Sequence, residues 1–154
     1  MDQFRVNTIL LDRHIGPAIS SLIHKSAFEK YGKYDEKFKS HEDYELWLRF
    51  CLQYNCRLYL VPKILVKWRV HKGQLSITTL RTGDERTENI RKHVLSKLDP
   101  KLREEYAIAL SEYRKKIPFN LWARKVIGNI MLKLLPASVA TKVIRFYWSR
   151  KGLQ

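Results

Sequence analysis

The sequence has no uninterrupted apolar run that approaches the ~18–20 residues needed to cross a bilayer. It also lacks an N-terminal charged segment followed by an apolar one, so no signal peptide is visible. Cysteine is scarce, with Cys51 and Cys56 alone. Two cysteines are too few for a disulfide framework, and their spacing is not that of a metal site. We therefore expect a cytoplasmic protein whose two thiols are reduced.

Several motifs are missing as well. No glycine-rich phosphate loop and no Asp-x-Asp motif occurs anywhere in the sequence, and zinc-finger, RRM and KH signatures are absent. Acidic residues are missing from Tyr113 to Gln154, where ten basic residues occur. Over the whole chain, 30 Lys and Arg face 15 Asp and Glu, a net charge of +15. Such an excess predicts an anionic partner, which is a nucleic acid, an anionic membrane surface or a phosphorylated ligand.

The chain has 154 residues, 45% of them apolar, which suits one domain or one domain with an appendage. Apolar runs between Gly and Pro breakers predict strands at 6–11, 18–23, 58–61 and 64–70. Helical periodicity and cap residues predict helices at 25–31, 42–54, 85–98, 101–116, 119–135 and 137–149. The expected fold is α/β over residues 1–80, followed by an all-helical, basic, amphipathic region over residues 81–154.

Two adjacent carboxylates, Glu42 and Asp43, begin the helix expected at 42–54. Such a pair has a structural explanation, because Ser40 fits an N-cap with Asp43 at N3, and the helix dipole stabilises first-turn carboxylates by about 0.3–1 kcal/mol. A carboxylate fixed at a helix start is also well posed to accept a proton from a substrate hydroxyl. The aromatic Trp47 falls on the apolar stripe of the same helix and is expected in the core.

A histidine, His71, ends the strand expected at 64–70. A single histidine there is usually solvated or capping, and it does not make a metal site alone. A divalent cation in phosphate chemistry takes carboxylates and substrate oxygens as well.

The order of these features is more informative than any one of them. The motifs are Phe28-Glu29-Lys30-Tyr31-Gly32-x-Tyr34-Asp35-Glu36, Glu42-Asp43-Tyr44-Glu45-Leu46-Trp47-Leu48-Arg49, Val61-Pro62, and Arg69-Val70-His71-x-Gly73-x-x-Ser76. In this order and spacing, residues 14–80 resemble the C-terminal half of the nucleotide-sugar-binding region of family 2 glycosyltransferases, which have the GT-A fold.

The resemblance implies a role for each matched residue. Asp43 matches the catalytic base, which takes the proton of the acceptor hydroxyl with inversion at the anomeric carbon, and Glu42 would assist it. His71 matches a residue that helps to hold a divalent metal, Mn²⁺ or Mg²⁺, on the donor diphosphate. The other matched residues would line the substrates, with Gly16 and Pro17 on the acceptor side and Arg69, Gln74 and Ser76 on a loop over the donor.

The chain departs from the family pattern upstream of Gly16, where a nucleotide-binding unit ending in Asp-x-Asp is expected and only fifteen residues stand. We therefore expect a truncated chain that is inactive alone, and a separate N-terminal half is a candidate partner. The other partners would be a nucleotide-sugar donor and a glycan or lipid-linked acceptor. The Gln-x-x-Arg-Trp motif of processive synthases is also absent, which favours non-processive transfer.

The alternative is a small basic protein without catalysis that binds a membrane surface or a nucleic acid. The net positive charge of the chain supports both membrane binding and nucleic-acid binding. Nucleic acid is the weaker partner, because the basic residues do not interleave with stacking aromatics on one strand face.

The basic region is expected either to pack on the α/β part as solvated helices or to bind anionic lipid at a membrane surface. Two apolar stripes lie among its cations, and each cation adds about 1 kcal/mol near an anionic surface. The chain should therefore sediment with vesicles that contain phosphatidylserine and much less with phosphatidylcholine vesicles. Equal partitioning onto the two vesicle types would contradict this peripheral membrane association. The stripes consist of Trp122, Val126, Ile130, Met131 and Leu134, and of Val139, Val143, Ile144, Tyr147 and Trp148.

Overall fold

The computed structural model describes residues 2–14, 18–67 and 83–120, with single positions and short pieces between 130 and 143. The chain divides into two compact units. One comprises Met1–Leu65 and Glu85–Lys116, and the other comprises Val66–Asp84 and Ile117–Gln154. The boundary that the sequence suggests near residue 80 falls outside the described residues and stays a prediction.

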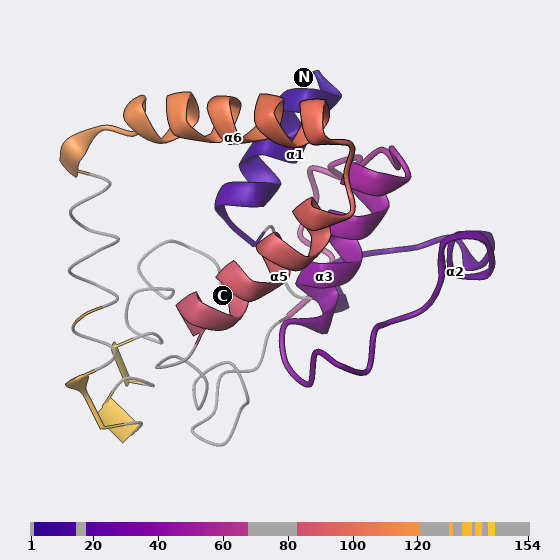
Figure 1. Ribbon diagram of the computed structural model, residues 1–154. Coiled ribbons are helices and arrows are strands. Elements are labelled where there is room, and N and C mark those ends of the chain that lie inside the picture. The colour runs from indigo at the N-terminus through magenta and orange to yellow at the C-terminus, as the bar shows by residue number, and fades with distance from the viewer. Residues whose placement is uncertain are drawn as a thin grey trace. The chain divides into compact units, whose positions relative to one another are not determined.

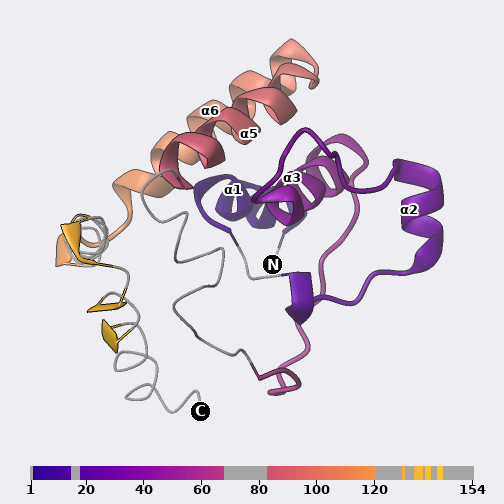
Figure 2. The same ribbon diagram turned by 90° about the horizontal axis from the view of Figure 1, so that it is seen from below.

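The first unit is built from helices (Figure 1). Helix α1 packs against α3 and α6, and α3 runs directly into η2. The short helix α2 lies to one side of the others in both ribbon views (Figures 1 and 2). In chain order the elements are α1 (Gln3–Asp12), the 3₁₀ turn η1 (Ala18–Ser20), α2 (Lys25–Tyr31), α3 (Glu42–Leu48), the π-helix η2 (Arg49–Gln53), α5 (Gly83–Ser96) and α6 (Pro100–Lys115).

The expected α/β fold is wrong, since the described residues form helices and no strand. A strand persists only when a neighbouring strand pairs with its backbone groups, and none of the described segments offers one. The prediction of a GT-A half, which requires a sheet, fails with it.

The first expected strand, 6–11, lies within α1. The side chain of Asp2 caps this helix by accepting a hydrogen bond from Arg5 N at 3.4 Å. The buried positions Asn7, Leu10 and Leu11 follow helical spacing, which the β-branched neighbours obscure in the sequence. Thr8 also suits the helix, because its Oγ1 donates to the carbonyl of Phe4 at 2.9 Å.

The other expected strands, at 18–23, 58–61 and 64–70, have no strand structure at their described positions. Residues 18–20 form η1, and the remaining described positions are irregular. Several of their apolar side chains face solvent, with exposed fractions of 103% for Leu22, 91% for Leu60 and 72% for Leu65. These segments have the apolar composition of strands but no neighbour in the described part that would bury them.

The helices expected after residue 24 are confirmed where the structure describes them. The helix α2 ends at Gly32, whose φ of 88° and N–H bond to the carbonyl of Phe28 make the expected C-cap. Pro100 occupies the first turn of α6, and the Asp99 carboxylate accepts from Lys101 N at 2.9 Å. The helices expected at 119–135 and 137–149 lie largely outside the described residues.

The hydrophobic core lies between α1, α3, η2, α5 and the start of α6. The expected core residue Trp47 is buried, with 3% of its surface exposed. Burial also raises the pKa of the Cys51 thiol to about 12, so this thiol stays protonated at neutral pH. The buried apolar residues are Leu10, Leu11, Tyr44, Leu46, Trp47, Leu48, Phe50, Cys51, Leu52, Ile90, Val94, Leu98 and Tyr106.

The C-terminal end of α1 is fixed by two side chains from other helices. The hydroxyl of buried Tyr44 lies 2.9 Å from the carbonyl oxygen of Leu10 and 3.3 Å from that of Leu11. Arg91 of α5 donates to this hydroxyl from Nε at 3.1 Å and to the carbonyl of Asp12 from Nη2 at 2.8 Å. Terminal carbonyls of a helix that lack intrahelical partners are thereby satisfied, next to a cation that suits the helix dipole.

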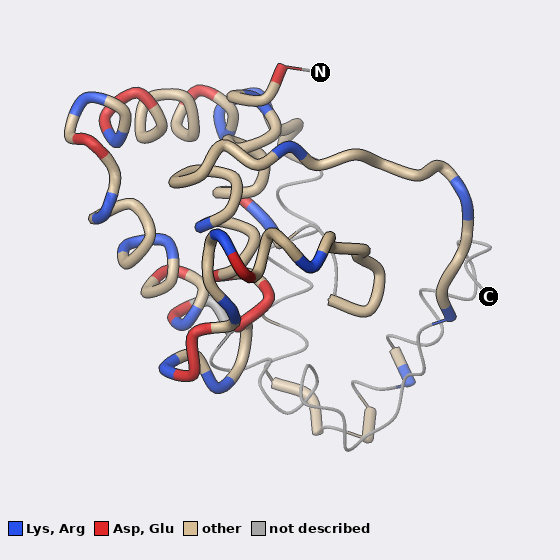
Figure 3. The backbone as a smooth tube through the Cα atoms, turned by 90° about the vertical axis from the view of Figure 1, so that its right-hand side faces the viewer, with Lys and Arg blue, Asp and Glu red and all other residues tan. Residues whose placement is uncertain are grey.

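The two units differ in charge. The first has 19 Lys and Arg and 14 Asp and Glu, a net charge of +5, and the second has 11 and 1, a net charge of +10. Basic and acidic residues both occur along α5 and α6 (Figure 3). None of the helices in the described residues is long and apolar enough to cross a membrane.

Removing the Tyr44 hydroxyl should destabilise the first unit. In Tyr44→Phe, the carbonyls at the end of α1 and the Arg91 guanidinium lose a buried partner, which costs about 1–3 kcal/mol. The free energy of unfolding in urea measures the loss. The matched control is Tyr59→Phe, because Tyr59 is 82% exposed and its change should stay within about 0.5 kcal/mol. Equal effects of the two substitutions would contradict this role of Tyr44.

Candidate functional site

The structure describes two of the expected site residues, Glu42 and Asp43, in the first turn of α3. The other expected positions lie outside the described residues, so their placement stays a prediction: Gly16, Pro17, Arg69, His71, Gln74 and Ser76.

The carboxylate of Asp43 is held by three donors. Oδ1 lies 3.1 Å from Nε2 of His14 and accepts a hydrogen bond from Tyr44 N at 2.9 Å. Oδ2 accepts one from Ala18 N at 3.2 Å. The side chain is 18% exposed, so it combines a fixed orientation with access from solvent. This is the arrangement that a carboxylate needs in order to take a proton from a bound hydroxyl.

These contacts also control the ionisation of Asp43. Burial raises the pKa of this carboxyl, but the hydrogen bond and charge of His14 and the amides of Tyr44 and Ala18 lower it by more. The net result is a pKa below the usual value of an aspartic acid. Asp43 is therefore ionised at neutral pH and ready to accept a proton.

The residue that sequence reasoning missed is His14. It follows α1 after one intervening residue, and its ring lies 5.3 Å from that of Tyr44, centroid to centroid. The expectation of a strand at 6–11 hid this position, because only the helical course of α1 brings its end against α3. Nothing in the local sequence marks His14 as a partner of a carboxylate 29 residues away.

The start of α3 has an unusual cap. Its N-cap is His41, with a left-handed φ of 65° and no side-chain capping bond, and the expected cap Ser40 does not fill this position. Ser40 is instead buried, and its Oγ accepts a hydrogen bond from Nη1 of Arg86. Burial lowers the pKa of His41, as do the nearby His14 and Arg86, while the carboxylates of α3 partly oppose them.

An ion pair between Glu45 of α3 and Arg49 of η2 places the loop that carries Tyr34. Arg49 binds Glu45 at 2.8 Å, and both side chains are almost fully buried. The guanidinium of Arg49 also donates to the carbonyls of Tyr31 and Lys33, at 2.5 and 2.6 Å. The loop after α2 is thus bound to α3.

The side chain of Tyr34 lies in the field of the two carboxylates. Its pKa is raised by burial and then by the negative charges of Asp43 and Glu42. Tyr34 therefore stays a neutral hydroxyl, able to donate a hydrogen bond.

The described residues offer no group of three or more His, Cys, Asp or Glu side chains that could hold a metal ion. The expected metal ligand His71 lies outside them, so the metal prediction is untested.

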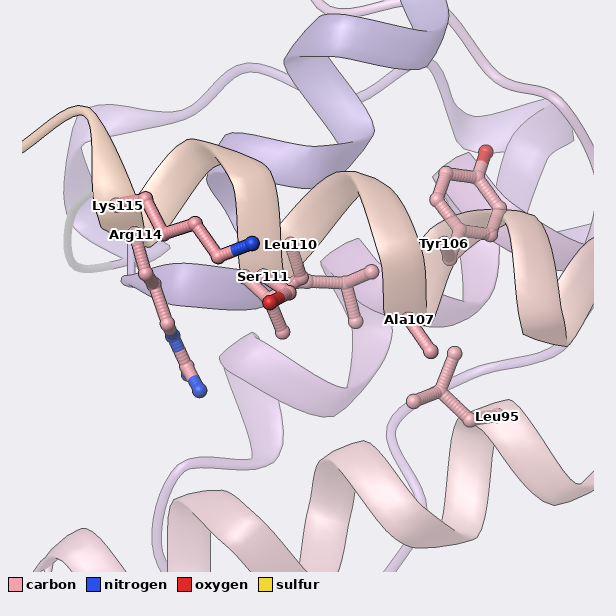
Figure 4. A pocket seen from close by; sticks show the side chains of 8 residues that line it. Leu95, Tyr106, Ala107, Leu110, Ser111, Arg114 and Lys115 are labelled. Carbon is pink, nitrogen blue, oxygen red and sulfur yellow. The ribbon is translucent and has the colours of Figure 1, made fainter.

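A surface hollow between α1, α5 and α6 is separate from the carboxylate pair and contains none of the expected site residues (Figure 4). Its basic groups are already engaged, since Arg114 binds Asp12 at 3.1 Å and Lys115 binds Glu112 at 2.7 Å. The lining residues are Leu11, Leu95, Tyr106, Ala107, Leu110, Ser111, Arg114 and Lys115.

Two curated bacterial proteins are similar to this chain. It is 34% identical over 82 residues to an uncharacterized glycosyltransferase of Rickettsia typhi and 33% identical over 82 residues to one of Rickettsia prowazekii. Each similarity covers 49% of this chain and 25% of the relative, so the chain spans about a quarter of these relatives. No family model matches the sequence, and no solved structure matches it. The two similarities support a relationship with glycosyltransferases.

The strained cap predicts that His41→Asn stabilises the chain, and more so in acid. Asn tolerates a left-handed φ and caps helices well, which is worth about 1 kcal/mol. The lowered pKa of His41 adds a pH-dependent part, because the unfolded chain takes up a proton below about pH 6.5 that the folded chain resists. The chain with His41 therefore loses free energy of unfolding as the pH falls below about 6.5, and the Asn variant does not have this loss.

Urea unfolding at pH 5 and pH 8 should show a larger gain for His41→Asn at pH 5. The control is His24→Asn, which removes an exposed histidine that caps α2. The prediction would be contradicted if His41→Asn raised the free energy of unfolding equally at the two pH values, or by as much as His24→Asn does.

Proposed function

We propose that this chain carries the acceptor-activating part of a glycosyltransferase, which transfers a sugar from a nucleotide-sugar donor to an acceptor hydroxyl. The observation that carries the proposal is the fixed, ionised carboxylate of Asp43, with three donors on its oxygens and an open side. The relationship with proteins named as glycosyltransferases gives the reaction class.

In the proposed reaction, Asp43 accepts the proton of the acceptor hydroxyl while that oxygen attacks the anomeric carbon of the sugar. The bond from this carbon to the diphosphate breaks, and its electron pair leaves with the nucleoside diphosphate. A single displacement of this kind inverts the configuration at the anomeric carbon. Glu42, next to Asp43 in the first turn, would orient the acceptor.

Asp43 must be ionised before the acceptor binds, and its lowered pKa meets this condition. A carboxylate with a low pKa is a weak base, so it removes the proton only as the new C–O bond forms and the hydroxyl becomes more acidic. The site therefore acts through general base catalysis in the transition state, a contribution of about 10²–10⁴-fold in rate.

The donor side of the reaction needs groups beyond the described residues. A divalent cation, Mn²⁺ or Mg²⁺, would neutralise the leaving diphosphate when bound, and His71 is the residue proposed to help hold it. With no Asp-x-Asp in the sequence, we propose that donor-binding groups come from another polypeptide segment and that the chain is inactive alone. The absence of the processive motif fits the transfer of one or a few sugars.

The acceptor is proposed to be a glycan or a lipid-linked molecule. The second unit supports the lipid-linked form, because its net charge of +10 suits the surface of an anionic membrane.

The decisive test is Asp43→Asn at the chromosomal gene of the organism that encodes the chain, where any further segment or partner is present. Asn keeps the shape of the side chain but has no basic oxygen, so transfer should fall by about 10²–10⁴-fold. Mass spectrometry of surface glycans should then show a structure that lacks one sugar, as in a strain from which the gene is deleted.

The matched control is Asp99→Asn, which alters the cap of α6 and leaves the carboxylate pair intact. This strain should keep the complete glycan. A complete glycan in the Asp43→Asn strain rules out Asp43 as the base, and a complete glycan in the deletion strain rules out the proposed function.

A further inference from the structure

We propose that His14 is a positioning residue of this reaction, which holds Oδ1 of Asp43 so that Oδ2 faces the acceptor hydroxyl. The inference rests on the proposed function and names a residue outside every motif that suggested it. The geometry that carries it is the contact of 3.1 Å between Nε2 of His14 and Oδ1 of Asp43.

The donors on the carboxylate show which oxygen is left to react. An ionised carboxylate has about four lone-pair positions, two on each oxygen. Oδ1 receives His14 Nε2 and Tyr44 N, so both of its positions are used. Among the donors in the described part of the chain, Oδ2 receives Ala18 N alone, at 3.2 Å, and keeps one position for a substrate proton. His14 thus decides the face that Asp43 presents.

His14 is itself well anchored. It lies two residues beyond the end of α1, where Tyr44 and Arg91 hold the last carbonyls of the helix. Its ring also packs against the ring of Tyr44. Tyr44 follows Asp43 in the chain and donates its backbone N–H to the same carboxylate. Tyr44 therefore helps to position both the His14 ring and the Asp43 carboxylate, and neither depends on a flexible surface side chain.

The other charged and titratable groups around Asp43 differ in kind from His14. Glu42 and His41 lie beside it in the chain, and the negative charge of Asp43 helps to raise the pKa of Tyr34 in the loop after α2. Arg86 of α5 reaches the cluster through Ser40 and His41. Among the described side chains, His14 is the one that donates a hydrogen bond to Asp43.

This contact has two consequences for the reaction. It fixes the rotation of the carboxylate, so that Oδ2 points to the acceptor without a loss of side-chain entropy on binding. It also favours the ionised form of Asp43, so this carboxylate can accept a proton down to a lower pH than it could without His14. Loss of His14 should both slow transfer and move the acidic limb of its pH profile upward.

Two substitutions separate the hydrogen bond from the packing of the ring. His14→Phe keeps a ring against Tyr44 and removes the donor, whereas His14→Gln keeps an N–H donor and removes the ring. His24→Gln is the matched control, because His24 is exposed and contacts Ser26 and not Asp43. Circular dichroism of each purified chain checks that the variants fold.

The first measurement is a ¹³C NMR titration of the Asp43 carboxyl in the purified chain. Its midpoint should rise in His14→Phe, rise less in His14→Gln and stay unchanged in His24→Gln. An unchanged midpoint in folded His14→Phe overturns the inference. If His14→Phe does not fold, the comparison of His14→Gln with His24→Gln decides, and equal midpoints overturn it.

The second measurement is the transfer rate in extracts of strains with the same substitutions, using the nucleotide sugar whose residue the Asp43→Asn strain fails to add. His14→Phe should lower the maximal rate about 10- to 100-fold and move the acidic limb to higher pH. His14→Gln should retain most of the rate. A merely structural role would lower the rate without moving the limb, and that result overturns the inference.

Failure of the proposed function would look different. In that case Asp43→Asn retains the complete glycan, while His14→Phe still moves the carboxyl midpoint.

Discussion

The structure depends on how the carbonyl groups at the end of α1 are satisfied. A helix end inside a core leaves polar groups without intrahelical partners, and each would cost about 1–3 kcal/mol if it stayed unpaired. Tyr44 and Arg91 remove this cost together, since the hydroxyl and the guanidinium bind three successive carbonyls and each other. The same contacts determine where the chain leaves α1, and thereby where His14 meets Asp43.

A second buried polar network joins the other end of this core. The side chain of Asn7 donates to the carbonyl of Cys51 at 3.3 Å and to the hydroxyl of Tyr106 at 2.9 Å, and it accepts from Gln3. The carbonyl of Cys51 belongs to the π-helix η2, whose wider turn departs from regular α-helical bonding. Buried polar networks that are satisfied in this way specify one arrangement of helices, because any other packing would leave their groups unpaired.

Local chemistry made part of this structure predictable. Asp99 with Pro100 marks the start of α6, Gly32 marks the end of α2, and Trp47 was expected in the core, and all three predictions were correct. The fold class was wrong, because Val6, Thr8 and Ile9 suggest a strand, while the hydrogen bonds of Asn7 that favour a helix come from distant partners. The carboxylate pair was visible as a motif, but His14 depends on tertiary packing and has no local signal.

In the proposed reaction, the position of Asp43 would let a helical unit supply one part of sugar transfer without the other. Removal of a proton needs one carboxylate with a fixed direction and an ionised ground state, and the contacts around α3 provide both. Stabilising a leaving diphosphate needs several charges that converge on it, and the described residues contain no cluster of metal ligands. These two demands are independent, because the first acts on the acceptor oxygen and the second on the opposite side of the sugar. In the proposed reaction, a weak base held rigidly at α3 would therefore act only when a bound donor makes the attacking hydroxyl more acidic.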